Sequence, residues 1–249
     1  DGPLLIISGP GSGKTRTLTH RIAWLLYNGV FPENILAVTF TNKAGKEMKN
    51  RIHHILQTDQ IPKACTFHSW CVSVLRSNIH LLKSSFDNKF SIYDTDDQVR
   101  AYKEVMKALG LDTKKVSPSE YQRRISYAKN QSLNPRAYLE SSRYATPQDR
   151  DTTLAVYDDY HKLLEKNNAL DFDDLILKTI RLLRTDEATL NYYHSRYTHI
   201  LVDEYQDTNE PQVTLVKLLA YAHCDPKTFN WDGRSLTGVG DDGQGIYSF

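Results

Sequence analysis

The sequence contains too few cysteines to build a disulfide framework. Only Cys65, Cys71 and Cys224 occur in 249 residues, and this odd set includes no Cys-x-x-Cys pair. Such usage indicates reduced, buried or half-buried thiols and disfavours a zinc site. We therefore expect an intracellular protein, for which the bacterial cytoplasm and the eukaryotic nucleus are both open.

Long apolar runs and a dominant charge are also absent. No apolar run approaches the ~20 residues that a membrane helix needs, so we expect no membrane partner. The 31 basic and 30 acidic residues leave a net charge of +1, so a DNA-binding surface has to arise from local arrangement. The hydrophobic fraction of 40% is ordinary for a globular protein of one large or two modest domains.

Short apolar runs alternate with segments of helical periodicity at both ends of the chain. The runs predict strands at residues 4–7, 35–40, 64–68, 199–202 and 236–240. The run at 4–7 is continuous, which is typical of a strand buried on both faces. Strands that alternate with helices predict an α/β fold with a parallel sheet.

The middle of the chain has a different character. From Ser84 to Arg196 the pattern is almost entirely helical, without a strong strand candidate, and Pro118 and Pro135 suit first-turn helix positions. We therefore predict a discontinuous α/β domain of residues 1–83 and 197–249, with a helical insertion at 84–196. Both ends of the chain lie inside structured patterns, so we expect it to be part of a longer protein.

A glycine-rich loop joins the first predicted strand to a helix. Its residues are Ser8, Gly9, Pro10, Gly11, Ser12, Gly13, Lys14 and Thr15. Such a loop turns successive N–H groups toward one point, and the positive end of the following helix adds to the attraction for phosphate. Lys14 would reach the outer phosphates of ATP and the Thr15 hydroxyl would bind Mg²⁺. The strict pattern has glycine where this chain has Ser8.

An acidic pair follows the strand predicted at 199–202. In a protein with a phosphate loop, a carboxylate at this place holds magnesium, so we assign Asp203 to that role. We assign Glu204 to orienting and deprotonating the attacking water. Acidic strand ends are also common on ordinary protein surfaces, and the loop on the same chain is what favours function.

Six segments together resemble the UvrD/Rep-type DNA helicases of superfamily one. They are GPGSGKTR at 9–16, TFTNKA at 39–44, TFHS at 66–69, LDFDDL at 170–175, VDEYQDTN at 202–209 and VGDDGQGIY at 239–247. The resemblance spans nearly the whole chain and implies a RecA-like P-loop NTPase domain that carries an inserted all-helical subdomain.

The resemblance also implies roles for individual residues. Arg16 would lie near the adenine, Gln206 would couple the nucleotide site to DNA, and Gln244 would sense the γ-phosphate and join Lys14 and Glu204 in catalysis. The residues implied at the DNA are Phe40, Asn42, Lys43, His68, Tyr247 and Phe249. Stacking on aromatic rings tolerates any base, which suits a motor that moves on every sequence.

Each of these candidate DNA-binding residues also has an alternative explanation as an ordinary structural or surface residue. Phe40 could belong to the core, His68 could be a structural histidine, and Tyr247 and Phe249 could be ordinary strand residues. Lys43 belongs to a basic stretch that could be a solvated helix face; its other members are Lys46, Lys49 and Arg51.

The chain departs from the family pattern at three glycines. Gly243 and Gly245 replace an aspartate and a serine beside Gln244, which adds backbone freedom there. Gly45 stands where alanine is usual, and glycine inside a helix costs ~1 kcal/mol.

The resemblance implies an ATP-dependent DNA helicase of 3′-to-5′ polarity that acts on single-stranded and duplex DNA. One alternative is the motor of a helicase–nuclease. Another is a non-catalytic DNA-binding remnant, which only the two glycines beside Gln244 support. The family's second motor domain would follow Phe249, so we expect this chain alone to hydrolyse ATP slowly.

Overall fold

The structure is a computed structural model that describes residues 1–9, 11–57 and 60–241. The chain forms two compact units. Unit 1 comprises Asp1–Trp70, Leu183–Thr208 and the residues from Gln212 on, and unit 2 comprises Cys71–Leu182 with Asn209–Pro211. The domain limits expected from the sequence, 84 and 196, stay a prediction.

Unit 1 is built on a parallel five-stranded sheet in the order β1-β7-β6-β2-β3. The strands are β1 (Gly2–Ile7), β2 (Ile35–Thr39), β3 (Lys63–Thr66), β6 (His199–Val202) and β7 (Ser235–Gly240). Because all strands run in one direction, the loops after β1, β6 and β7 emerge at the same edge of the sheet. This edge gathers the residues that the sequence marked as functional.

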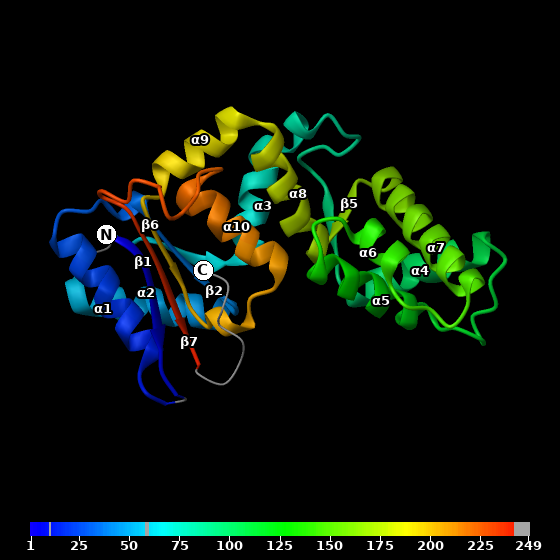
Figure 1. Cartoon of the computed structure of the whole chain (residues 1–249), viewed down its shortest axis with the longest axis horizontal. Coiled ribbons are helices and arrows are strands. Elements are labelled where there is room, and N and C mark those ends of the chain that lie inside the picture. Colours follow the sequence, from blue (N-terminus) through cyan, green and yellow to red (C-terminus); the bar gives the residue numbers. More distant parts are fainter. Residues whose placement is uncertain (10, 58–59, 242–249) are drawn as a thin grey trace. The chain divides into compact units, whose positions relative to one another are not determined.

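Helices cover both faces of this sheet (Figure 1). On one face lie α1 (Lys14–Tyr27) and α2 (Asn42–Leu56), and on the other lie α9 (Glu187–Arg196) and α10 (Glu210–Tyr221). Period-3.6 apolar positions of α1 and α2, such as Ile22 and Ile52, bury completely against alternate residues of the strands. The sheet with its two helical layers confirms the predicted α/β class.

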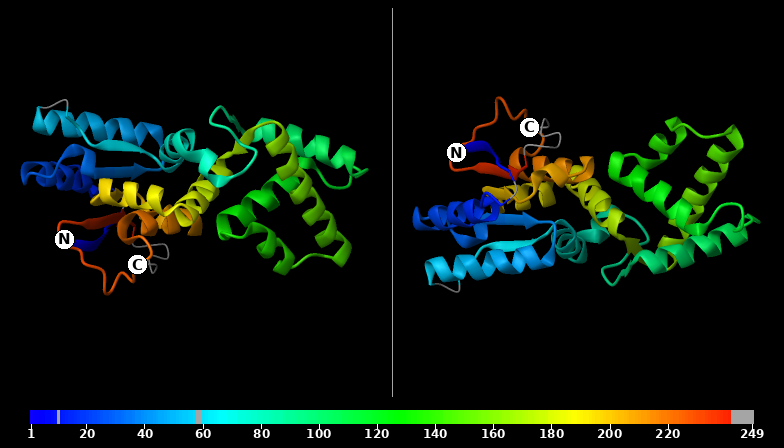
Figure 2. Two further views of the ribbon diagram at one scale, coloured as in Figure 1. Left: turned by 90° about the horizontal axis from the view of Figure 1, so that it is seen from above. Right: turned by 90° about the horizontal axis from the view of Figure 1, so that it is seen from below.

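The core of unit 2 is formed by the helices α4 (Thr95–Ala108), α5 (Pro118–Gln131), α6 (Pro135–Ser141) and α7 (Pro147–Lys166), seen in green in Figure 2. Three of them begin with proline after a serine, asparagine or threonine whose side chain accepts an N–H of the first turn. The predicted first-turn positions of Pro118 and Pro135 are confirmed. The rings of Tyr102 and Tyr160 stack in the core with centroids 4.0 Å apart.

Two helices each contain a point at which the chain passes from one unit to the other. They are α3 (Phe67–Asn78) and α8 (Phe172–Thr185). Each contributes residues to both units.

Three expectations from the sequence were wrong. The insertion is not all-helical, because β4 (Ser91–Tyr93) and β5 (Ala169–Asp171) pair as a parallel two-stranded sheet. Strands of three residues are too short to show the alternation of apolar and polar residues by which a strand is predicted. The first strand is not buried on both faces, because β1 is at the sheet edge and Leu4 and Ile7 are 42% and 48% exposed. The strand predicted at 64–68 ends at Thr66, and His68 lies in the first turn of α3.

Candidate nucleotide-binding site

The glycine-rich loop connects β1 to α1 with a backbone that needs glycine. Gly11 and Gly13 have φ angles of 75° and 91°, a region that side-chain-bearing residues rarely occupy. Gly13 caps α1 without a side-chain hydrogen bond, so the first N–H groups of the helix have no side-chain cap. An uncapped helix start with its positive dipole end is suited to phosphate.

Ser8 is accommodated at the place where the strict pattern has glycine. The Ser12 hydroxyl lies 2.8 Å from Ser8 Oγ and donates to the carbonyl of Gly9 at 2.6 Å. The backbone N–H of Ser8 donates to the carbonyl of Gly240 at 3.0 Å. These contacts hold the base of the loop to the end of β7.

Asp203 follows β6 and is buried, with 3% exposure. Its carboxylate accepts a hydrogen bond from the Thr15 hydroxyl at 3.4 Å. Burial and the neighbouring Glu204 charge raise the pKa of Asp203, while the hydrogen bonds from the Glu204 N–H and Thr15 and the Lys14 charge lower it. A hydroxyl and a carboxylate oxygen at this separation are hard ligands of the kind that Mg²⁺ prefers.

Glu204 stands next along the chain in a left-handed backbone conformation, with φ of 49°. A non-glycine residue there is strained by roughly 1–2 kcal/mol, and such strain concentrates at functional positions. Gln206 donates to the Glu204 carboxylate at 2.8 Å, and its carbonyl oxygen accepts the backbone N–H of Asp241 at 3.1 Å. Gln206 therefore connects the candidate base to the end of β7.

Lys14 lies among carboxylates. Its side chain is only 9% exposed, its ammonium pairs with Asp241, and it lies 3.7 Å from Glu204. Sequence reasoning gave Asp241 no role, although an acid directly after a predicted strand was a visible signal. The structure thus brings Lys14, Thr15, Asp203, Glu204 and Asp241 together at one edge of the sheet.

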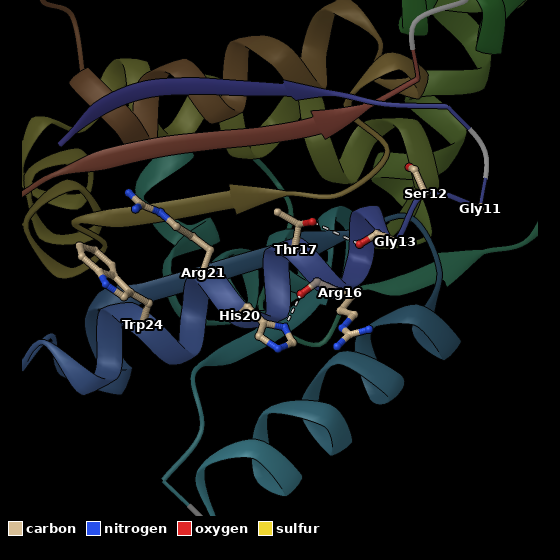
Figure 3. A pocket seen from close by; sticks show the side chains of 8 residues that line it. All are labelled: Gly11, Ser12, Gly13, Arg16, Thr17, His20, Arg21 and Trp24. Atoms are coloured by element: carbon tan, nitrogen blue, oxygen red, sulfur yellow. Dashed lines mark hydrogen bonds between the residues drawn. The ribbon is translucent and has the colours of Figure 1, made fainter.

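A pocket of about 1010 Å³ opens beside the loop, along the outer surface of α1 (Figure 3). Arg16, predicted near the adenine, lines this pocket, and its contact with nucleotide stays a prediction. His20, Arg21 and Trp24 also line it, with the Arg21 guanidinium 5.2 Å from the Trp24 ring centroid. Sequence reasoning missed these three, although they follow Arg16 at helical spacing.

The candidate DNA-binding residues that are described lie at the ends of β2 and β3. Phe40 is half-buried and contacts Phe67 edge-to-face, with ring centroids 5.8 Å apart. Asn42 and Lys43 are exposed in the first turn of α2. His68 is half-buried, and burial lowers its pKa. Pro10, Gln244, Tyr247 and Phe249 lie outside the described residues.

Known proteins resemble this chain over its whole length. The model of the UvrD/REP helicase N-terminal domain matches residues 1–249. The chain belongs to this family. It is 43% identical over 251 residues to the ATP-dependent DNA helicase PcrA of Staphylococcus epidermidis strain RP62A, and 42% identical to PcrA of Staphylococcus aureus strain Mu50. Each match covers all of this chain and 32% of the relative, so the UvrD/REP-type chain spans about a third of their length.

Two features are absent from the described residues. Within 1–9, 11–57 and 60–241, no helix combines the length and apolarity needed to cross a bilayer. The same residues contain no cluster of three or more histidine, cysteine or acidic side chains suited to a metal ion.

Proposed function

We propose that this chain is the ATP-binding part of an ATP-dependent DNA helicase. The observation that carries the proposal is the meeting of Lys14 and Thr15, from the loop after β1, with Asp203 and Glu204 after β6. A loop for phosphate opposite two carboxylates is the arrangement that nucleoside triphosphate hydrolysis requires. The family supplies the DNA substrate, since the relatives are named ATP-dependent DNA helicases.

Each residue has a chemical part in this proposal. Lys14 exchanges its carboxylate partners for the outer phosphates, and the N–H groups at the start of α1 hold the others. Thr15 and Asp203 would hold Mg²⁺, which would neutralise charge on the phosphates. Glu204 orients a water for in-line attack on the γ-phosphorus and accepts its proton, while the bond from that phosphorus to the bridging oxygen breaks and ADP leaves. Gln206 orients the Glu204 carboxylate through its hydrogen bond, and it couples a movement of the Asp241 backbone to the position of that carboxylate.

The DNA side of the proposal rests on the resemblance and on placement. Phe40, Asn42, Lys43 and His68 follow strands of the same sheet as the nucleotide site, so single-stranded DNA can contact them while ATP is bound. Movement in the 3′-to-5′ direction is part of the proposal. Unwinding of duplexes that carry only a 3′ tail, compared with only a 5′ tail, tests it.

Lys14→Ala tests the nucleotide site. Loss of a charged donor to phosphate costs about 1.5–3 kcal/mol, so we expect fluorescent ATP analogues to bind roughly 10- to 100-fold more weakly. Lys107→Ala, which removes an exposed lysine of α4, is the matched control and should bind as wild type does. Unchanged affinity in Lys14→Ala would contradict the proposal, and it would favour a non-catalytic DNA-binding remnant.

A further inference from the structure

A second pocket lies wholly within unit 2, where α5, α6 and the start of α7 pack together. Its volume is about 480 Å³, within the range of sites that bind small organic ligands. Its walls combine tyrosine rings with arginine side chains. The lining residues that matter here are Arg124, Tyr127, Tyr138, Arg143, Tyr144 and Asp149.

One ring of this tyrosine–arginine pocket, that of Tyr127, is open to solvent, whereas Tyr138 and Tyr144 are half-buried. Tyr127 is 59% exposed, which is unusual for a large ring on a helix that otherwise buries its apolar side. Tyr127 and Tyr138 meet edge-to-face, with centroids 6.2 Å apart and an interplanar angle of 63°. Such a contact covers one face of one ring, so it leaves other ring faces of the pair for a planar ligand.

The charges of the pocket favour an anion. Arg124 already forms ion pairs with two carboxylates, because its guanidinium lies 3.1 Å from Glu120 and 3.0 Å from Asp149. The Asp149 carboxylate is thereby neutralised. Arg143 is exposed, and no ion pair or hydrogen bond of its side chain is found among the described residues. The pocket therefore presents one uncompensated guanidinium and the exposed ring of Tyr127.

We propose that the tyrosine–arginine pocket binds one unpaired nucleotide of single-stranded DNA, with the base against Tyr127 and the phosphate on Arg143. This inference rests on the proposed helicase function, which supplies the DNA. Bases inside a duplex are stacked on one another, so a side-chain ring takes only a base that has left the stack. A guanidinium suits the accompanying phosphate because its fork of N–H donors matches the phosphate oxygens.

The test measures binding of a fluorescein-labelled oligothymidylate to the whole chain by anisotropy. Loss of one stacked base weakens binding by about 5-fold or more, so Tyr127→Ala should do so, while Tyr127→Phe should stay close to wild type. Arg143→Ala should reduce the slope of log affinity against log salt by about 0.7, the value for one phosphate on a single strand.

Two control variants match these changes. Arg123→Ala removes an exposed arginine of α5, the helix that carries Tyr127; this arginine pairs with Glu120 at 2.8 Å. Tyr192→Ala removes a tyrosine of α9 that is 55% exposed. Both should keep the wild-type affinity and salt slope. Oligonucleotides with 5-iodouracil should form a photochemical cross-link to the peptide that contains Tyr127, and Tyr127→Ala should abolish it.

Three outcomes would overturn the inference. One is wild-type affinity and salt slope in both Tyr127→Ala and Arg143→Ala. Another is displacement of the labelled oligothymidylate by free thymidine monophosphate as effectively as by unlabelled oligothymidylate, which would indicate a pocket for free nucleotides. The third is no DNA binding by a chain whose ATP binding depends on Lys14, which leaves the proposed nucleotide site standing. Failure of the proposed function itself is distinguished by ATP binding that survives Lys14→Ala.

Discussion

Replacement of Lys129 by methionine is expected to destabilise unit 2 far more than any exposed lysine would. The Lys129 side chain is 1% exposed, and its ammonium lies 2.7 Å from Asp171 and 2.9 Å from Asp174. Burial alone would lower the pKa of Lys129, but the two carboxylates outweigh it and raise the pKa, so the lysine stays charged. Tyr160 donates a further hydrogen bond to Asp171 at 3.1 Å.

The magnitude follows from what the substitution leaves behind. Methionine fills similar space but leaves the two buried carboxylates without their ion-pair partner. His161 does not supply a replacement charge, because burial lowers its pKa well below the usual value. Removal of one partner from a buried ion pair costs about 3–5 kcal/mol, a large share of the ~5–15 kcal/mol that stabilises a domain.

Urea unfolding can assign the effect to unit 2. The three tryptophans, Trp24, Trp70 and Trp231, all belong to unit 1, so tryptophan fluorescence follows that unit alone. With an m value of about 2 kcal/mol per molar, we expect the circular dichroism transition of unit 2 to shift by roughly 2 M. The fluorescence transition should shift much less.

Lys162→Met is the matched control. Lys162 pairs with Asp159 at 2.7 Å, but it is 74% exposed, and such pairs contribute at most about 1 kcal/mol. Equal shifts for the two variants would refute the reasoning that burial makes the Lys129 pair important. A shift confined to the tryptophan signal would refute its placement in unit 2.

Three further substitutions have defined outcomes. Asp241→Asn frees the Lys14 ammonium from a competing carboxylate, so ATP analogues should bind about fivefold more tightly by calorimetry; weaker binding would contradict this. Burial, with nearby positive charges, lowers the pKa of His199 to about 4, so the unfolded chain binds more protons between pH 4 and 6.5. Stability should therefore fall by at most roughly 3 kcal/mol as pH drops through this window, and His199→Asn should flatten the profile; an unchanged slope would refute it. Gly13→Ala forces alanine to a φ of 91°, so it should lower the free energy of unfolding in urea by about 1–2 kcal/mol and weaken nucleotide binding. In Gly9→Ala the added methyl meets no atom within 4 Å, so this variant should be as stable as the wild type.

Features carried by local sequence were predictable. The strand His199–Val202 has the limits expected from its apolar pattern. The parallel sheet followed from alternation of such segments. The role of the loop at 8–15 as a phosphate cradle stays a prediction, although its two left-handed glycines show why that composition was required.

Features that depend on distant residues were not predictable. Ser91 pairs with Ala169 across the inserted helices, and neither three-residue strand has a pattern of its own. Lys129 looks like an ordinary surface lysine on a helix, yet the fold buries it against Asp171.

The sequence by itself determined the α/β class and the residue types that we propose for binding phosphate and magnesium and for activating water, because glycine content, apolar period and strand-end acids act locally. Only the tertiary structure decided that Asp241 reaches Lys14, that Gln206 connects it to Glu204, and that tyrosines and arginines form a pocket in unit 2. These relations join residues far apart in the chain. Their energies depend on burial and distance, which packing sets.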